Sequence, residues 1–253
     1  MQWANAQGIW LMGEVHDNAE GHRRRFEELV ALIETGARPA IAMEQFDRGS
    51  QPALDAAMQR CEEASCVVAA AAEGRTRWAW THYLPVIDLA LKHRLPVLAA
   101  NLSREEASRV VRAGFAGAFD DALRLRYGLD APLPEHLLRA QEAAVREGHC
   151  GQLPETLVAP MARAQMARDV WMAKVVEDAA VAGDVVLLAG NGHVRRDLGV
   201  ARWLADPLRR RARTVGFIEP GGVGEFDRRV GIGRAERGDP CAGVIVPAAK
   251  GAA

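Results

Sequence analysis

Several short runs of consecutive apolar residues each end at a polar residue or a glycine, and this pattern most restricts the fold. Unbroken apolar runs are typical of strands buried on both faces, as in parallel sheets covered by helices, whereas half-exposed strands alternate. The runs are Ile9–Met12, Ala40–Met43, Leu95–Ala100, Val185–Ala189 and Thr214–Ile218. Segments with helical spacing separate them. The sequence therefore predicts an α/β fold, a largely parallel sheet that helices cover on both faces.

Side chains able to carry chemistry follow three of these runs. Glu14 and His16 lie in the first of two Gly-x-x-His motifs, His193 ends the second, and Glu44 ends another run. In open parallel sheets, ligands bind beyond the carboxyl ends of the strands. We therefore expect Glu14, His16, Glu44 and His193 to converge in one cleft, lined also by Asn101, Arg168 and Asp169.

These residue types allow more than one chemistry. His16, Glu44 and His193 are two imidazoles and a carboxylate, a set that holds a divalent metal and leaves a position for water. Glu14 is then the candidate general base beside the metal. Without a metal, His16 and Glu44 are a candidate pair of base and orienting group. In the third interpretation, the motifs are turns and backbone groups satisfy the histidines.

The segments between the runs predict helices and one insertion. We expect helices at 20–36, 51–73, 83–93, 156–182 and 200–211, and a last strand at 243–246. The stretch from Phe115 to Leu153 contains helical pieces without an evident strand. It predicts a helical insertion at about 115–155 within a single domain of residues 1–253. The basic cluster at residues 22–25 is either a solvated helix face or a group that faces a ligand.

Charge and cysteine content exclude some classes of protein. The chain has 32 basic and 33 acidic residues, a net charge of −1, which argues against a dedicated nucleic-acid binder. Cys61 and Cys66 are five positions apart in an apparently helical stretch, a poor separation for a disulfide. Cys150 and Cys241 form no recognisable motif with them. We therefore expect the four scattered cysteines to be reduced, buried or incidental.

The sequence does not determine the cellular compartment. No segment reaches the roughly 18 apolar residues of a membrane span. The first residues have neither a basic nor an apolar leader region, and the first predicted strand follows almost directly. As it stands the chain predicts a cytoplasmic protein, and with a leader removed it predicts an exported or membrane-associated one.

Six motifs, taken in order, resemble the ChaN family of iron-regulated haem-binding proteins. The motifs are Gly13-Glu14-Val15-His16-Asp17-Asn18, Met43-Glu44-Gln45-Phe46-Asp47, Trp78-Ala79-Trp80-Thr81-His82-Tyr83-Leu84-Pro85, Ala100-Asn101, Ala164 to Ala173, and Ala189-Gly190-Asn191-Gly192-His193-Val194. The family belongs to a superfamily with the Tiki metalloproteases and the erythromycin esterases. The resemblance implies a parallel α/β core with a helical appendage, a haem ligated by tyrosine, and a dimer with two haems face to face. It also implies that the paired motifs and Glu44 correspond to the catalytic or metal site of the superfamily.

The favoured function is therefore a haem-binding protein of iron uptake or handling, and the alternative is a metal-dependent hydrolase. The chain has two tyrosines, and a phenolate oxygen suits ferric haem iron. We favour Tyr83 as the ligand over Tyr127, because it lies in the Trp-rich motif before a helix. His82 is a rival ligand. Arg75 and Arg77 are the expected partners of the haem propionates.

Overall fold

The computed structural model of the chain describes residues 8–72, 78–239 and 241–242. These residues fall into two compact units. The sheet unit lies within residues 1–103 and 169–235, and the helical unit lies within 104–168 and 236–253. The helical unit thus includes the predicted insertion at about 115–155. The single domain of residues 1–253 stays a prediction.

The sheet unit is built on six strands, all paired in parallel. Their order is β3-β2-β4-β1-β5-β6, so β4 lies between β2 and β1. The strands are β1 (Ile9–Met12), β2 (Ala40–Asp47), β3 (Val97–Asn101), β4 (Val185–Leu188), β5 (Ala212–Ile218) and β6 (Arg228–Gly231). The five apolar runs correspond to β1 to β5, which confirms the predicted fold class. The sequence did not predict β6, because Arg228-Arg229-Val230-Gly231 is not an apolar run.

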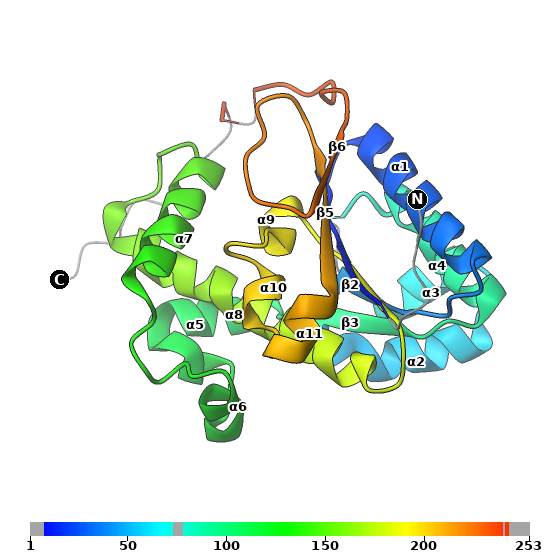
Figure 1. The fold of residues 1–253 in the computed structure, drawn as a ribbon, viewed down its shortest axis with the longest axis horizontal. Helices are drawn as coiled ribbons and strands as arrows, with labels where there is room; N and C mark the ends of the chain where they lie inside the picture. Colours follow the sequence, from blue (N-terminus) through cyan, green and yellow to red (C-terminus); the bar gives the residue numbers. More distant parts are fainter. Residues whose placement is uncertain (1–7, 73–77, 240, 243–253) are drawn as a thin grey trace. The chain divides into compact units, whose positions relative to one another are not determined.

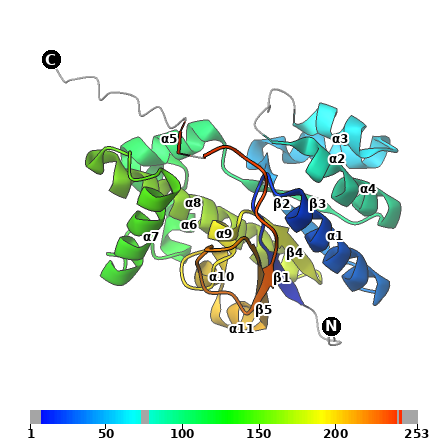
Figure 2. The same cartoon turned by 90° about the horizontal axis from the view of Figure 1, so that it is seen from above.

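Helices cover both faces of this sheet. In both views, α1, α3 and α4 lie on one side of the strands, and α10 and α11 lie on the other (Figures 1 and 2). The bounds on the first side are α1 (Ala19–Glu34), η1 (Arg48–Ser50), α2 (Gln51–Arg60), α3 (Ala64–Ala71), η2 (Trp80–His82) and α4 (Leu84–His93). The later elements are α9 (Asn191–Val194), α10 (Val200–Trp203) and α11 (Asp206–Arg211).

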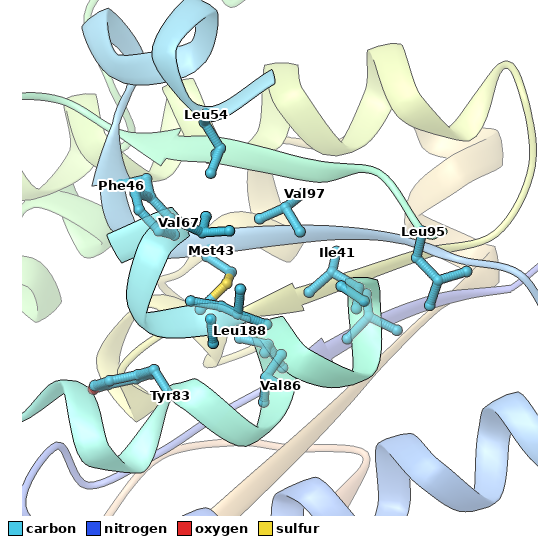
Figure 3. Packing of buried hydrophobic residues seen from close by; sticks show 14 of the residues in the cluster. Ile41, Met43, Phe46, Leu54, Val67, Tyr83, Val86, Leu95, Val97 and Leu188 are labelled. Carbon is cyan, nitrogen blue, oxygen red and sulfur yellow. The ribbon is translucent and has the colours of Figure 1, made fainter. Parts of the chain in front are cut away.

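One hydrophobic core joins the strands to α1–α4. Alternate strand residues such as Met12, Met43 and Leu188 point into it, because successive side chains of a strand face opposite sides of the sheet. Figure 3 shows this packing, with Val86 of α4 and the ring of Tyr83 beside the strand residues. Each such fully buried large side chain contributes about 1.5–3 kcal/mol to folding.

Helix α1 turns one face towards this core, and its start is fixed by a cap. The side chain of Asn18 accepts a hydrogen bond from the Gly21 N–H at 2.8 Å. The buried positions include His22, Arg25, Leu29 and Ile33, which share one helical face. The basic cluster is therefore divided, since Arg23 and Arg24 lie on the outer part of the helix and pair with Glu27 and Glu20.

The helical unit contains no strand in the part that the structure describes, as predicted for residues 115–153. Its elements are α5 (Arg104–Ala113), η3 (Gly114–Gly117), α6 (Asp121–Arg126) and α7 (Glu135–Gly148), followed by the first part of α8 (Glu155–Ala180). A small core of Val145, Val158 and Ala162 holds α7 against α8. The predicted strand at 243–246 lies outside the described residues.

The expectation of four reduced thiols is wrong. Disulfides join Cys61 to Cys66 and Cys150 to Cys241, each with a Cα–Cα distance of 5.7 Å. The predicted helix at 51–73 is in fact two helices, because α2 ends at Arg60 and Cys61 has an extended backbone (φ −83°, ψ 143°). This break brings the first two cysteines within bonding distance. Among the described residues, no helix is both long and apolar enough to cross a membrane.

Candidate functional site

The carboxyl ends of four neighbouring strands bring polar residues to one edge of the sheet. Backbone bonds between the strand ends fix their positions: the Asn191 N–H donates to the Glu14 carbonyl at 2.9 Å. The buried Asn101 amide donates to the Glu44 carbonyl, also at 2.9 Å. Adjacent parallel strands thus place the two Gly-x-x-His motifs and Glu44 side by side.

Glu14 is the centre of the first half of the site. Its Oε1 accepts hydrogen bonds from the Tyr83 hydroxyl at 2.6 Å and from Gln45 Nε2 at 3.3 Å. His16 Nδ1 lies 2.7 Å from the same oxygen, and Arg25 forms an ion pair with Oε2. Burial alone would raise the pKa of Glu14, but the Arg25 charge and the His16 hydrogen bond outweigh it and hold the pKa far below its ordinary value.

His22 is a neutral imidazole close to the Glu14 carboxylate. Arg25 Nη2 donates to its Nδ1 at 3.1 Å, so its proton is on Nε2, which lies 3.0 Å from the His16 carbonyl. Burial and the nearby Arg25 charge lower the pKa of His22 to about 4. The 3.8 Å approach of Nδ1 to Glu14 is therefore not an ion pair at neutral pH.

His16 lies at the exposed border of the site. Half of its side chain is exposed (50%), and its ring contacts Trp78 edge-on with centroids 4.9 Å apart. Burial of the remainder lowers the pKa of His16, but the Glu14 hydrogen bond and the Glu44 charge raise it by more, so the net shift is upward. Glu14 and Glu44 therefore favour the protonated form of this ring.

The second half of the site is centred on His193. Its Nδ1 lies 2.6 Å from Asp169 Oδ1, and its Nε2 lies 3.6 Å from Glu44 Oε1. The other Glu44 oxygen accepts the Gly190 N–H at 2.7 Å. All three side chains are buried. Carboxylates therefore orient both imidazoles through Nδ1, and this arrangement can fix a tautomer and hold or transfer a proton.

The two halves meet at Gly190. A Cβ at this position would lie 3.1 Å from His16 Nε2 and 3.6 Å from Glu44 Oε2, so no larger residue fits without displacement. The site therefore brings Glu14, His16, Glu44 and His193 together as predicted from the strand ends. Arg168 lies in the helical unit, and its expected place beside the cleft stays a prediction.

The expected divalent-metal site is not supported. Within residues 8–72, 78–239 and 241–242, no group of three or more His, Cys, Asp or Glu side chains is arranged to hold a metal ion. The carboxylate oxygens are instead committed to protein donors: the Glu14 oxygens to Tyr83 and Arg25, and Glu44 Oε2 to the backbone. The catalytic and metal roles of these residues stay predictions.

The predicted haem residues differ in accessibility. Tyr83 is fully buried, whereas the Tyr127 ring, at the end of α6, is partly exposed. Burial, together with the Glu14 charge and hydrogen bond, raises the pKa of Tyr83 far above its usual value. His82 stacks on His22 with centroids 4.5 Å apart. Arg75 and Arg77 lie outside the described residues.

Sequence reasoning missed the role of Arg25 and Gln45. The signal for Arg25 was present, because His22, Arg25, Leu29 and Ile33 recur at helical spacing and the last two are apolar. A basic residue on an apolar helical face needs a buried anion. Gln45 had no comparable signal, since it directly follows Glu44 on β2 and its side chain turns to Glu14 only in the folded chain.

The fold and the site define the chain as an α/β protein with a fully parallel sheet and a polar network at the carboxyl ends of its strands. The family profile described as haem-binding uptake, Tiki superfamily, ChaN matches residues 1–204. The chain therefore belongs to this ChaN family of haem-binding uptake proteins. This result confirms the family resemblance of the six motifs, and nothing in it favours the hydrolase alternative.

Solved structures support the same fold. One, described as cofacial heme binding to ChaN of Campylobacter jejuni, has a TM-score of 0.67 and 20% identity, and the match covers 87% of this chain and 86% of that chain. Another, an erythromycin esterase mutant in its open conformation, has a TM-score of 0.51 and 14% identity, covering 85% and 71%. At these identities the similarity is one of fold. A comparison with curated proteins found no significant match.

Proposed function

We propose that this protein binds ferric haem for iron uptake or handling, and that the phenolate of Tyr127 ligates the iron. Family membership over residues 1–204 supports haem as the ligand. Tyrosine is one of the protein ligands of haem, and its anionic oxygen suits ferric iron. The chain offers two tyrosines, so the question is which of them an incoming haem can reach.

The burial of Tyr83 carries this choice, which reverses the preference based on the sequence. Its hydroxyl donates to Glu14 at 2.6 Å, and its side chain is 0% exposed. A haem iron would have to break this bond and enter the core. The negative charge of Glu14 also disfavours the phenolate, which is the form that binds iron.

The surroundings of Tyr127 suit haem better. In the last turn of the same short helix, the side chain of Leu125 is 81% exposed and is available to an apolar ligand. The Arg126 guanidinium lies 5.4 Å from the centre of the Tyr127 ring and provides a cation for a propionate. Arg75 and Arg77 remain proposed propionate partners from the sequence. An exposed apolar residue beside an arginine fits an amphipathic ligand of this kind.

We further propose that haem is held in a homodimer. A porphyrin has two apolar faces, and a partly exposed tyrosine on a short helix covers only part of one. A second copy would cover the remainder. The C. jejuni ChaN structure is described as cofacial heme binding, which supports this arrangement. Light scattering with and without hemin tests it: we expect the dimer fraction to rise with hemin, and a monomer at saturating hemin would refute it.

Hemin titration of two matched variants tests the ligand. Tyr127→Phe and Tyr83→Phe each remove one hydroxyl and keep the ring. We expect Tyr127→Phe to weaken hemin binding at least tenfold and to shift the Soret band, and Tyr83→Phe to leave the spectrum unchanged. His82→Gln tests the rival ligand in the same assay and should behave like the parent. A spectrum changed by Tyr83→Phe or His82→Gln alone would refute the assignment of Tyr127.

A further inference from the structure

The two disulfides have very different settings. Cys61–Cys66 closes a separation of five residues between α2 and α3, and Cys61 is only 8% exposed and belongs to the core of the sheet unit. Cys150–Cys241 spans a separation of 91 residues within the helical unit. Both of its cysteines are partly exposed. Cys66 is also partly exposed but packs against that core. The chain thus contains one disulfide with a buried cysteine, packed on the core, and one whose two cysteines are both partly exposed.

Both cysteines of Cys150–Cys241 lie outside helices and strands. Residues 236–239, which lead to Cys241, form neither helix nor strand, and all four are exposed. In addition to the disulfide, a long hydrogen bond joins the same two segments, because Gln152 Nε2 donates to the Cys241 carbonyl at 3.4 Å. Cys150 follows α7 with φ +55°, in the left-handed region that residues with a Cβ seldom adopt. Opening the bond would let both segments relax.

These settings predict different redox behaviour. A thiolate must reach a sulfur atom to open a disulfide, so accessible disulfides exchange more readily. Re-formation depends on how often the two thiols meet. Cys61 and Cys66 would stay together between two packed helices after reduction, whereas Cys241 would move away on an exposed segment, which lowers the effective concentration of the pair.

We propose that Cys150–Cys241 is a thiol-exchange site that a dithiol reductant opens selectively, releasing the segment before Cys241 from the helical unit. The reductant thiolate attacks one sulfur of the disulfide, forms a mixed disulfide and expels the other cysteine as a thiolate. The second thiol of the reductant then expels the first cysteine. The protein gains two electrons and two protons as two thiols, and the reductant leaves as its own disulfide.

Redox titration of the full chain tests selectivity. The protein is equilibrated with defined ratios of reduced and oxidised dithiothreitol and alkylated, and the modified fraction of each cysteine is measured by peptide mass spectrometry. We expect the equilibrium constant for reduction to be at least tenfold larger for Cys150–Cys241 than for Cys61–Cys66, a difference of about 30 mV. Equal constants, the reverse order, or four free thiols in the untreated protein would overturn the proposal.

A matched pair of double variants tests the release of the segment. Hydrogen exchange of the backbone amides of residues 236–239 is compared in Cys150→Ser/Cys241→Ser and in Cys61→Ser/Cys66→Ser. We expect several-fold faster exchange in the first variant and no change in the second. Unchanged exchange in the first variant would show that the bond does not hold the segment. If that variant does not fold, reduction of the natural chain under the selective conditions provides the same comparison.

Discussion

Replacing Glu14 by Gln should remove a large part of the stability of the sheet unit. Glu14 and Arg25 are both buried, with side chains 0% and 1% exposed. The variant keeps a carbonyl oxygen that can accept from Tyr83 and Gln45, but it leaves the Arg25 cation without its anion. Removing one partner of a buried ion pair costs about 3–5 kcal/mol. That is a large share of the roughly 5–15 kcal/mol that stabilises a typical protein.

Urea unfolding measures this loss, and hydrogen exchange shows whether it falls in the sheet unit. Glu27→Gln is the matched control. It removes an Arg–Glu pair on the same helix, but both partners, Arg23 and Glu27, are 58% exposed. We expect that control to change the free energy of unfolding by at most about 0.5 kcal/mol.

A double-mutant cycle tests the cause of the effect. In Glu14→Gln/Arg25→Met, the buried cation is absent, so the loss should be clearly smaller than the sum of the two single losses. A loss below about 1 kcal/mol for Glu14→Gln, or additive losses in the double variant, would refute the view that Arg25 needs this carboxylate as its buried counter-ion.

The remaining predictions concern Gly190, His22 and Asp169. Gly190→Ala should displace the His16 ring and lower the free energy of unfolding by about 1–3 kcal/mol. Gly192→Ala, whose Cβ would meet no atom within 4 Å, should be near neutral. Proton NMR of His16 and urea unfolding check both variants, and equal effects would contradict the reasoning. His22 has a folded-state pKa of about 4, against 6.5 for an ordinary histidine, so the unfolded chain binds more protons between these values. Stability should therefore fall by up to about 3 kcal/mol as the pH falls from 6.5 to 4, and His22→Gln should flatten this part of the profile; an equally steep profile in the variant would assign the effect to another group. Asp169→Asn should remove the charge from the hydrogen bond at His193 Nδ1 and cost about 1.5–3 kcal/mol. Calorimetry that shows no change would mean that the charge of Asp169 contributes nothing net.

The sequence alone determined the local structure and the positions of the strand ends. Continuous apolar runs do not depend on distant contacts, so β1 to β5 and the parallel class could be predicted from them. Parallel strands have their carboxyl ends at one edge, so the convergence of Glu14, His16, Glu44 and His193 followed directly. The helical insertion could be predicted for the same reason, since no apolar run interrupts residues 115–153.

Only the tertiary structure decided which side chains are buried and which partners they have. The insertion of β4 between β2 and β1 brings His193 next to Glu44, and strand order is not encoded in any single run. The motif of Tyr83 does not show its burial, but the fold buries this side chain and joins its hydroxyl to Glu14. The disulfide between Cys150 and Cys241 joins residues 91 positions apart. These contacts depend on how distant segments meet, which local sequence patterns do not specify.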